Sequence, residues 1–335
     1  LEKKIKLYTK SKYVLCVNSG TSAMHLGLTM MNIKKGEEIL LQSANYISNA
    51  NCLLYLNLTP HFIDIDFDNL SLDIEKLKKY LKETCIIKKK FSINKKTGKV
   101  IRALIVTHIF GHTCNLNKLI KILKKYKISL IEDSAESLGS FFNDKHTGTF
   151  GRFGILSFNG NKTITTGAGG AVLLKNHNDY LRARHYASIC KKVHSWEYDY
   201  SALGYNYLMP NLNASLGLSQ MKRLKFFLKK KIKIMNIYKK IFNGSSLGYI
   251  FVKSKSPKNY NSNYWLQTLI ISKKFIKEKD FIIKNLIDNG IKVRPLWKPL
   301  HKVSYLKKFP KMRNLKGTLE LYKRAINLPS GQNLL

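Results

Sequence analysis

The sequence predicts an α/β protein: a large domain with a mostly parallel central sheet flanked by helices, followed by a small α+β domain. Up to about residue 245, short apolar runs alternate with segments of helical periodicity, which is the pattern of successive βαβ units. A turn-forming stretch, Asn243-Gly244-Ser245-Ser246, then interrupts this pattern. Beyond it, strand-like and helical segments follow one another over shorter distances.

The first segments of the chain predict a helix, a strand and a second helix. Residues 1–8 have the spacing of an amphipathic helix that is already under way, so we expect the chain to be incomplete at its N-terminus. Val14–Val17 is apolar and predicts a strand, and helical periodicity follows over Ser22–Met31.

Six further apolar runs predict buried strands of a sheet that is covered on both faces. They are Glu38–Gln42, Pro60–Ile65, Ala103–Thr107, Ser129–Glu132, Ile155–Asn159 and Ala171–Leu174. Elsewhere in the same region, apolar residues recur every three or four positions, which predicts helices. These helices are expected at Ile74–Leu81, Lys118–Tyr126, His177–Ser188 and Asn213–Phe242.

The break at residue 243 divides the chain into a large domain, residues 1–243, and a small domain, residues 244–335. In the small domain, Tyr264–Ile271 alternates as a strand does, and Phe275–Asn289 has the periodicity of a helix closed by a glycine. Ile291-Lys292-Val293 is expected to form another strand. The final turn, Leu328-Pro329-Ser330-Gly331, has no closing element, so we expect the C-terminus to be incomplete as well.

The charge of the chain is strongly positive, with 59 lysine and arginine residues against 20 acidic ones and a net charge of +39. Only eight of the basic residues are arginine, the residue that nucleic-acid-binding proteins use for bidentate contacts. We therefore interpret the lysine excess as drift of tolerant surface positions in an AT-rich genome, and expect no specific nucleic acid partner. Binding of nucleic acid through charge alone stays open as an alternative.

The compartment is predicted from two further features. No apolar run approaches the length of a membrane-spanning helix, so we expect no membrane association. The five cysteines are scattered and show neither a CxxC pair nor a disulfide framework, which favours a reducing cytoplasm. His108 and His112 are four residues apart, but no acidic third ligand accompanies them, so we expect no metal site.

Three segments carry the chemistry. Residues 18–23 (NSGTSA) place small residues between a strand and a helix, where backbone N–H groups can hold a phosphate, although an ordinary capped helix start has the same pattern. Asp133 follows a buried strand and can hold a cationic ring nitrogen or simply cap a helix. Lys162 lies in a polar loop between a strand end and a glycine-rich return, a setting that suits an amine able to form a Schiff base.

Taken together, these segments resemble the DegT-like sugar aminotransferases, which are pyridoxal-phosphate enzymes of fold type I. The resemblance extends from about residue 7 to the C-terminus. Its carriers are SGTSA at 19–23, NYISNAN at 45–51, PHFIDID at 60–66, HIFGH at 108–112, EDSAESLGS at 132–140, SFNGNKTITTGAGG at 157–170, GYNYLMPN at 204–211, RPLWKPLH at 294–301 and LPS at 328–330.

The resemblance implies a role for each matching residue. Lys162 would form the Schiff base with pyridoxal 5'-phosphate and move the proton during the reaction. Asp133 would pair with the pyridinium nitrogen, and Glu136 would lie near the phenolic oxygen of the ring. Tyr46 would stack on the ring face.

The resemblance also implies a shared phosphate site. The cofactor phosphate would be held by Ser19, Gly20, Thr21, Ser22 and Ser157. Asn206 would reach the phosphate of the neighbouring subunit's cofactor, so the expected assembly is a homodimer with shared active sites.

Trp196, Trp265 and Trp297 are expected to belong to the core or the rim of the protein and not to a binding platform.

The implied reaction is transfer of an amino group from L-glutamate to C4 of a nucleotide-linked keto-sugar for surface glycan biosynthesis. The stretch NGNKTITTG at 159–167 most resembles the branch that aminates UDP-linked 4-keto-6-deoxy-N-acetylhexosamines. The same reaction on a GDP- or dTDP-linked keto-sugar stays open as an alternative. A non-catalytic homologue that only binds the cofactor is the alternative from another class of protein.

Overall fold

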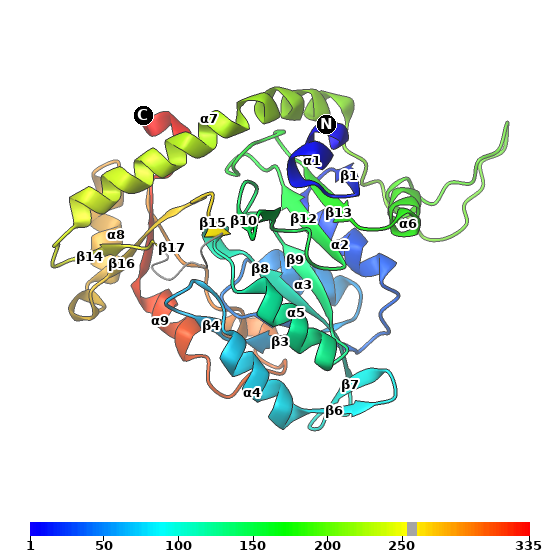
Figure 1. The fold of residues 1–335 in the computed structure, drawn as a ribbon, viewed down its shortest axis with the longest axis horizontal. Coiled ribbons are helices and arrows are strands. Elements are labelled where there is room, and N and C mark those ends of the chain that lie inside the picture. The colour runs from blue at the N-terminus through cyan, green and yellow to red at the C-terminus, as the bar shows by residue number, and fades with distance from the viewer. Residues whose placement is uncertain (253–259) are drawn as a thin grey trace.

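The computed structural model describes residues 1–252 and 260–335, and it has the α/β architecture that the sequence predicts (Figure 1). Its centre is a nine-stranded sheet whose main path has the order β1-β13-β12-β9-β8-β2-β3. A hairpin of β6 and β7 joins this sheet through the first residues of β8. The nine strands are β1 (Tyr13–Val17), β2 (Glu38–Gln42), β3 (Thr59–Ile63), β6 (Cys85–Lys88), β7 (Phe91–Asn94), β8 (Val100–Thr107), β9 (Ser129–Asp133), β12 (Phe153–Ser157) and β13 (Gly170–Leu174).

Strand β13 alone runs against its neighbours in the main path. β9 is parallel to β8 and β12, and β2 is parallel to β8 and β3, so the middle of the sheet is parallel as predicted, whereas the pairings of β13 and of the β6–β7 hairpin are antiparallel and make the whole sheet mixed. β13 is antiparallel to both β1 and β12, and its first residue, Gly170, lies opposite Val17 and Ser157. The end of β1, the end of β12 and the start of β13 therefore lie side by side.

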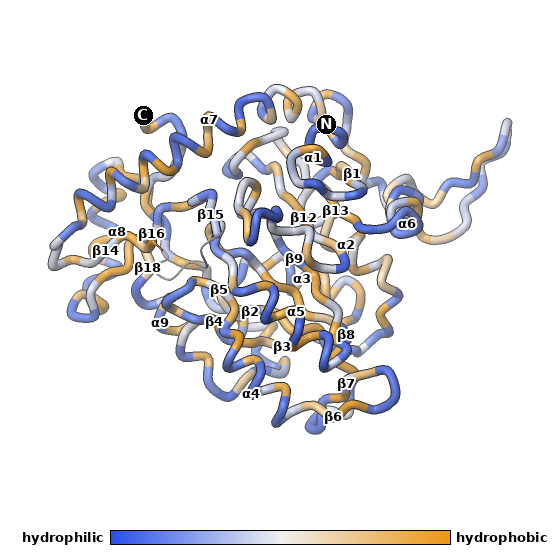
Figure 2. The backbone as a smooth tube through the Cα atoms, viewed as in Figure 1, coloured by the Kyte–Doolittle hydropathy of each residue, from blue (hydrophilic) through white to orange (hydrophobic). Residues whose placement is uncertain are grey.

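Helices cover both faces of the sheet, which explains why its central strands are buried along nearly their whole length. Alternate residues of one strand belong to different cores: Ile39 and Leu41 pack with one set of helices, and Leu40 packs with the other. The first set is α2 (Gly20–Met30), α3 (Ile47–Tyr55) and α6 (His177–Ala187), and the second is α4 (Ile74–Thr84) and α5 (Leu116–Lys125). Figure 2 shows the hydrophobic residues gathered in the strands between these layers.

A long helix, α7 (Asn211–Phe242), runs along one side of the molecule and joins its two ends (Figure 1). Near its start it contacts α1 (Glu2–Thr9), the helix that the spacing of residues 1–8 predicts. Further along, the buried Lys231 donates hydrogen bonds to the carbonyl oxygens of Trp265 and Ser330 at 2.8 and 2.7 Å. Burial lowers the pKa of Lys231 to about 8.

The C-terminal part builds a four-stranded antiparallel sheet in the order β14-β16-β18-β17. Residues 300–306 leave it and pack against the large sheet, where Leu300 and Leu306 join the core of α2 and α3. The division at residue 243 coincides with the end of α7, and two separate domains remain a prediction. The elements are β14 (Gly248–Ile250), β16 (Gln267–Ile271), α8 (Lys279–Asp288), β17 (Arg294–Pro295), α9 (Lys316–Arg324) and β18 (Ala325–Leu328).

The shorter strands lie outside these sheets. β10 (Phe141–Phe142) pairs with β11 (Lys145–His146) and with β15 (Tyr260–Asn261), which brings the C-terminal part onto the large one. β4 (Ile65–Asp66) and β5 (Ser71–Leu72) form a two-stranded hairpin.

Some element predictions were wrong. Ile291–Val293 is not a strand, because the N–H of Ile291 bonds to the carbonyl of Leu286 and closes the turn after α8. The strand follows directly as Arg294–Pro295. The predicted strand over 264–271 begins only at residue 267, and the predicted helix over 275–289 begins at 279 after a short 3₁₀ turn. Helix α3 has no counterpart among the predicted helices.

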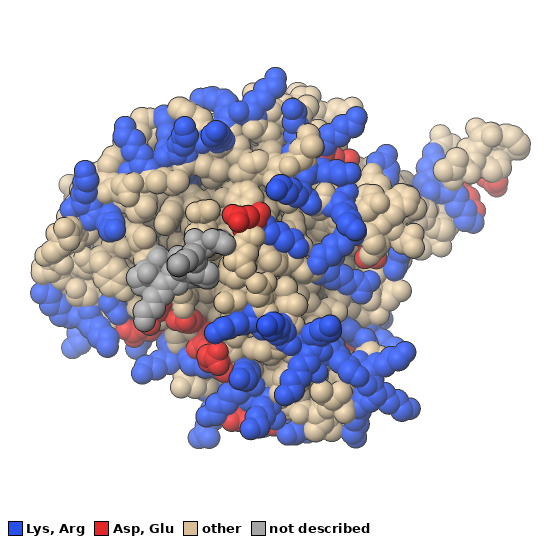
Figure 3. Space-filling model, in the orientation of Figure 1, with Lys and Arg blue, Asp and Glu red and all other residues tan. Residues whose placement is uncertain are grey.

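The surface of the protein is dominated by basic side chains, and Figure 3 shows few acidic groups between them on the face drawn. None of the helices in residues 1–252 and 260–335 combines the length and the apolar character that crossing a membrane requires. The segment between α6 and α7, residues 188–210, includes a long excursion that projects from the body of the molecule (Figure 1).

Candidate active site

A cavity of about 250 Å³ lies where β8, β9 and β12 end and α2 and α3 begin. Ligands bind at this edge in open α/β sheets, because the carboxyl ends of parallel strands meet there. Eight of the ten predicted site residues line the cavity, and Ser22 and Asn206 do not. The residues around it are Ser19, Gly20, Thr21, Asn45, Tyr46, Ser48, Asn49, Thr107, Asp133, Ala135, Glu136, Ile155, Ser157, Asn159, Asn161, Lys162, Ala168, Gly169, Trp265 and Trp297.

The turn before α2 has the geometry of an anion site. Ser19 is the N-cap, and its Oγ accepts from the Ser22 N–H at 2.9 Å and contacts the Ser22 Oγ at 2.8 Å. Ser22 therefore supports the turn from behind, which explains why it is not on the cavity wall. The first N–H groups of a helix, here those of Gly20 and Thr21, have no acceptor within the helix and can bind a phosphate.

The close approach of two strand ends explains the glycine in this turn. A Cβ on Gly20 would lie 2.9 Å from the Cβ and 3.1 Å from the Oγ of Ser157, at the end of β12. Gly170, at the start of β13, is packed in the same way: a Cβ there would lie 2.5 Å from the carbonyl oxygen of Ser19. The absence of these side chains keeps the two strand ends and the helix N-terminus close enough to act on one small anion.

Asp133 is the last residue of β9, and its carboxylate is 6% exposed. Oδ1 accepts from the N–H of Ala135 at 3.0 Å, and Oδ2 accepts from the Nδ2 of Asn49 at 2.6 Å. Hydrogen bonds of this kind stabilise the charged form of a carboxylate. Asp133 is therefore a fixed negative group in the cavity wall, suited to a cationic partner.

Lys162 lies in the loop between β12 and β13, where its backbone N–H bonds to the carbonyl of Asn159 at 2.9 Å. The loop directs the side chain into the cavity. Nζ lies 3.5 Å from Oε1 of Glu136 and 4.0 Å from the centroid of the Trp265 ring. This single amine thus meets a buried carboxylate on one side and an aromatic face on another.

Glu136 is held in place by an unusual backbone conformation. Its Oε2 accepts from the N–H of Phe110 at 2.9 Å, and Phe110 has a φ of 53°, in the left-handed region. Burial raises the pKa of Glu136 to about 7, although the Lys162 ammonium and the Phe110 N–H both favour the ionised form. Glu136 can therefore hold or release a proton near neutral pH.

The aromatic residues of the site agree in part with the sequence interpretation. Trp265 is buried and Trp297 packs against the same core, as expected, and both also line the cavity. Tyr46 is 54% exposed at the mouth, with its ring 6.2 Å from that of Trp297 in an edge-on arrangement. Trp196 lies on the projecting segment and is exposed.

Asn206 is exposed and lies outside the cavity. Its carbonyl accepts from the Nδ2 of Asn18 at 3.2 Å, next to the phosphate turn of its own chain. The flanking Tyr205 and Tyr207 stack on each other, and Tyr207 contacts His25 of α2 through its hydroxyl at 3.2 Å. The segment therefore has a local structural role that the sequence did not reveal, and the predicted reach into a neighbouring subunit stays a prediction.

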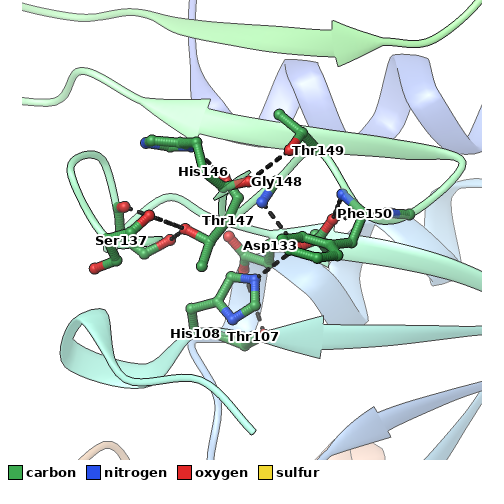
Figure 4. Close-up of polar contacts among 12 residues, drawn as sticks. Thr107, His108, Asp133, Ser137, His146, Thr147, Gly148, Thr149 and Phe150 are labelled. Carbon is green, nitrogen blue, oxygen red and sulfur yellow. Dashed lines mark hydrogen bonds and ion pairs between the residues drawn. The ribbon is translucent and has the colours of Figure 1, made fainter. Parts of the chain in front are cut away.

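A further buried carboxylate, Glu132, precedes Asp133 in β9 and accepts hydrogen bonds from the loop at residues 146–151, part of which Figure 4 shows next to His108. It accepts from the His108 Nε2 at 3.0 Å and from the backbone N–H groups of Gly148, Phe150 and Gly151 at 2.6 to 2.8 Å. His108 is thus committed to a carboxylate. Among residues 1–252 and 260–335, no group of three or more metal-binding side chains comes together.

Sequence reasoning missed Asn45, Asn49 and Thr107 on the cavity wall. The two asparagines belong to the segment at 45–51, which contributes to the resemblance but was given no structure. Asn45 lies two residues before the first residue of α3 and Asn49 lies in its first turn, so a helical pattern does not pair them, and the sequence carries no local signal that points to them.

The cavity fits pyridoxal phosphate in size and chemistry. It combines a helix N-terminus without crowding side chains, the amine of Lys162, the carboxylates of Asp133 and Glu136, and aromatic walls. A phosphate, an aldehyde, a ring nitrogen and a flat ring would each find a suitable partner there.

The sequence profile of the DegT/DnrJ/EryC1/StrS aminotransferase family matches residues 1–335. EpsN of Bacillus subtilis, assigned by name as a pyridoxal phosphate-dependent aminotransferase, is 34% identical over 330 residues, which cover 96% of this chain and 80% of that protein. GDP-perosamine synthase of Escherichia coli O157:H7 is 31% identical over 324 residues, covering 96% of this chain and 82% of that protein.

Relatives that differ in nucleotide are similar to this chain to nearly the same degree. The UDP-4-amino-4,6-dideoxy-N-acetyl-beta-L-altrosamine transaminase of Campylobacter jejuni is 29% identical over 330 residues, covering 98% of this chain and 82% of that protein. Among solved structures, PseC of Helicobacter pylori superimposes with a TM-score of 0.88 at 24% identity, covering 100% of this chain and 85% of that one. That likeness confirms the fold.

Proposed function

This chain belongs to the DegT/DnrJ/EryC1/StrS aminotransferase family, and we propose that it moves an amino group from L-glutamate to C4 of a UDP-linked 4-keto-6-deoxy-N-acetylhexosamine. The cofactor is pyridoxal 5'-phosphate, and the substrate class is a nucleotide-linked sugar. When bound, the cofactor supplies an electron-withdrawing ring that stabilises the charge left on carbon when a proton is removed.

The observation that carries this proposal is the position of the Lys162 amine. It lies in the cavity with Glu136 at 3.5 Å, and Asp133 is in the wall of the same cavity. Lys162 binds the cofactor covalently through Nζ, and in its free form the same Nζ takes up and returns the proton that moves during transamination. Asp133 supplies the negative charge for the ring nitrogen.

Glu136 and Tyr46 complete the arrangement around the amine. The carboxyl of Glu136, with its pKa of about 7, holds or accepts a proton at Oε1 beside Nζ. Tyr46, at the mouth, covers the ring face and limits the access of water. We assign the phosphate to the turn and strand ends formed by Ser19, Gly20, Thr21, Ser22 and Ser157, with Ser22 acting through Ser19.

Borohydride reduction tests the covalent assignment. The enzyme with bound pyridoxal phosphate is reduced and digested, and the labelled peptide is identified by mass spectrometry among the 51 lysines. We expect the label on Lys162, its loss in Lys162→Ala, and its retention in Lys118→Ala, which removes an exposed lysine of α5. Label on any other lysine of the wild type overturns the assignment.

A GDP-linked keto-sugar is the second candidate acceptor, because GDP-perosamine synthase is among the most similar relatives. Purified enzyme with glutamate is offered UDP-, GDP- and dTDP-linked 4-keto-6-deoxy sugars, and the products are weighed by mass spectrometry. Amination of the UDP-linked sugar at the highest kcat/KM supports the first candidate. Preference for the GDP- or dTDP-linked sugar overturns it, and no turnover with any of them supports a cofactor-binding homologue without catalysis.

We also propose a homodimer, and the projecting segment between α6 and α7 supports it. Val193, Trp196, Tyr198 and Leu203 are each more than three-quarters exposed there. Large apolar side chains on one projection favour a partner that removes them from water, and a second copy of the chain is the partner we propose. Analytical ultracentrifugation of the wild type and of Trp196→Ser would measure the expected weakening of the dimer.

The cellular compartment that we propose follows from the substrate. We place the enzyme in the cytoplasm, where nucleotide sugars are made and where its five buried thiols would remain reduced. Its product would serve the biosynthesis of a surface glycan such as a lipopolysaccharide. The basic surface attracts an anionic nucleotide sugar without requiring nucleic acid as a partner.

A further inference from the structure

The wall of the cavity behind Asp133 is built from amide and hydroxyl side chains, and the roles assigned above do not use them. Asn45 lies just before α3, Asn49 lies in its first turn, and Thr107 is the last residue of β8. All three line the cavity and are 3% exposed or less. Buried polar groups of this kind are costly unless they are paired, so their partners indicate what they do.

Asn49 makes the shortest contact with Asp133. Its Nδ2 lies 2.6 Å from Oδ2, which is a charge-assisted hydrogen bond. Thr107 lies further away, with Oγ1 at 3.5 Å from the same oxygen. Since the other carboxylate oxygen is held by the N–H of Ala135, the two oxygens of Asp133 are fixed from two different elements.

The position of Asn49 is itself fixed by its neighbours. Its amide also approaches Oδ1 of Asn45 and Oγ1 of Thr107, at 3.3 Å each, and Asn45 donates to the same hydroxyl at 2.9 Å. The backbone of Thr107 is clamped by the side chain of Gln42, which accepts from its N–H at 2.6 Å and donates to its carbonyl at 3.1 Å. The network thus links β2, β8, α3 and β9 behind a single carboxylate.

We propose that Asn49 is the positioning residue for Asp133: its amide fixes the rotation of the carboxylate and holds it in the charged form that a protonated ring nitrogen requires. This inference rests on the proposed function, in which Asp133 faces the cofactor ring. Asn49 acts through Asp133 and does not take part in the chemistry itself. Without it, Oδ2 would lose its closest donor in a place that water reaches poorly, and charge on the carboxylate would be less favourable.

The readout is the protonation of the ring nitrogen, which a merely structural role would not change. The enzyme is loaded with pyridoxal phosphate carrying ¹⁵N in the ring, and the ¹⁵N chemical shift and the visible spectrum are recorded. We expect a protonated nitrogen in the wild type and a shift toward the neutral form in Asn49→Ala. We also expect kcat to fall by about tenfold to a hundredfold, the range for one hydrogen bond to a charged group, with KM for glutamate changed much less.

Three variants complete the experiment. Asn51→Ala is the matched control, because Asn51 lies on the same helix but accepts from the Tyr305 hydroxyl, and it should behave as the wild type. Asn49→Ser keeps a donor and should recover part of the ¹⁵N shift. Asn49→Leu fills the space without a donor and replaces Asn49→Ala should that variant fail to fold.

The possible failures are distinguishable. A protonated ring nitrogen in both wild type and Asn49→Ala overturns the positioning role and leaves the proposed function intact. A neutral ring nitrogen in the wild type overturns both, since Asp133 would then have no cation to hold. An equal loss of ring-nitrogen protonation in Asn51→Ala would show that any change on this helix has the effect, and it would overturn the role of Asn49.

Discussion

His146 is a buried histidine behind the site, and its protonation makes the stability of the protein depend on pH. Its ring is 1% exposed; Nδ1 donates to the carbonyl of Thr147, and Nε2 accepts from the N–H of Gly139 at 3.0 Å. Both nitrogens are therefore engaged in the neutral form, and Figure 4 shows His146 next to Thr147 and Gly148 in the loop at residues 146–151. A proton on Nε2 would break the bond to Gly139 and place a charge in the interior. Burial accordingly lowers the pKa of His146 from 6.5 to about 4.

The size of the effect follows from that difference in pKa. The pKa difference of about 2.5 corresponds to about 3 kcal/mol of unfolding free energy. Because the folded pKa is below the unfolded value, this contribution is fully present above about pH 6.5 and is lost as the pH falls through about 4. In His146→Gln the amide can accept from Gly139 and donate to Thr147, but it does not titrate. We therefore expect the wild type to lose about 3 kcal/mol more than the variant between pH 7 and pH 4.

Urea denaturation of the cofactor-free protein is followed by circular dichroism at several pH values between 7 and 4, at one protein concentration. It measures how the unfolding free energy of the wild type and of His146→Gln changes with pH. Urea is uncharged and leaves electrostatic interactions unscreened. His194→Gln is the control, because it removes a histidine on the projecting segment and should leave the slope unchanged. An equal fall in the unfolding free energies of the wild type and His146→Gln between pH 7 and pH 4 would refute this reasoning. A buried ring that must take up a proton cannot leave the pH dependence of stability unaffected.

Three further predictions concern the site. Asp133→Asn should leave the fold intact, as circular dichroism would report, while kcat falls by several orders of magnitude because an amide cannot stabilise a protonated ring nitrogen; near-normal turnover would reduce Asp133 to a residue that only holds the turn after β9 through Ala135. Gly20→Ala should weaken binding of pyridoxal phosphate by at least about tenfold in a spectral titration, since its Cβ would lie 2.9 Å from the end of β12, whereas Gly160→Ala meets nothing within 4 Å and should bind normally. Mixing inactive Lys162→Ala and Asn206→Ala subunits should restore about a quarter of wild-type activity, because half of the dimers are hybrids with one intact site; no recovery despite proven subunit exchange would contradict the shared site.

The sequence predicted the central sheet well because its strands are buried on both faces. A run such as Glu38–Gln42 is apolar along its middle and cannot be mistaken for a surface helix. Turns and ends were harder: residues 291–293 look like a strand, but a hydrogen bond back to α8 makes them a turn. Such a bond depends on how the preceding helix ends, and periodicity does not report it.

The site was predicted where its residues stand out from their local pattern. Lys162 lies in a loop that offers no helical face, and Asp133 ends a buried strand, so both could be singled out. Asn49 could not, because its importance comes from a carboxylate 84 residues further along the chain. The place of Trp265 and Trp297 on the cavity wall was not predicted for the same reason: only the packing of the C-terminal part brings Trp265 over Lys162.

The reversed strand β13 has a consequence for how the protein is made. It is inserted between β1, the first strand of the chain, and β12, and it pairs with both along its whole length. The proposed phosphate site is formed by the turn at residues 19–20 and by Ser157, and Gly170 packs against that turn. The site therefore cannot be complete on a ribosome-bound chain that ends before residue 174. Closing a pairing between residues 13–17 and 170–174 is slow compared with local contacts, because the entropy lost in closing so long a loop opposes it. The cofactor is therefore captured late, by a sheet that is already assembled, and cannot serve as the nucleus around which the sheet forms.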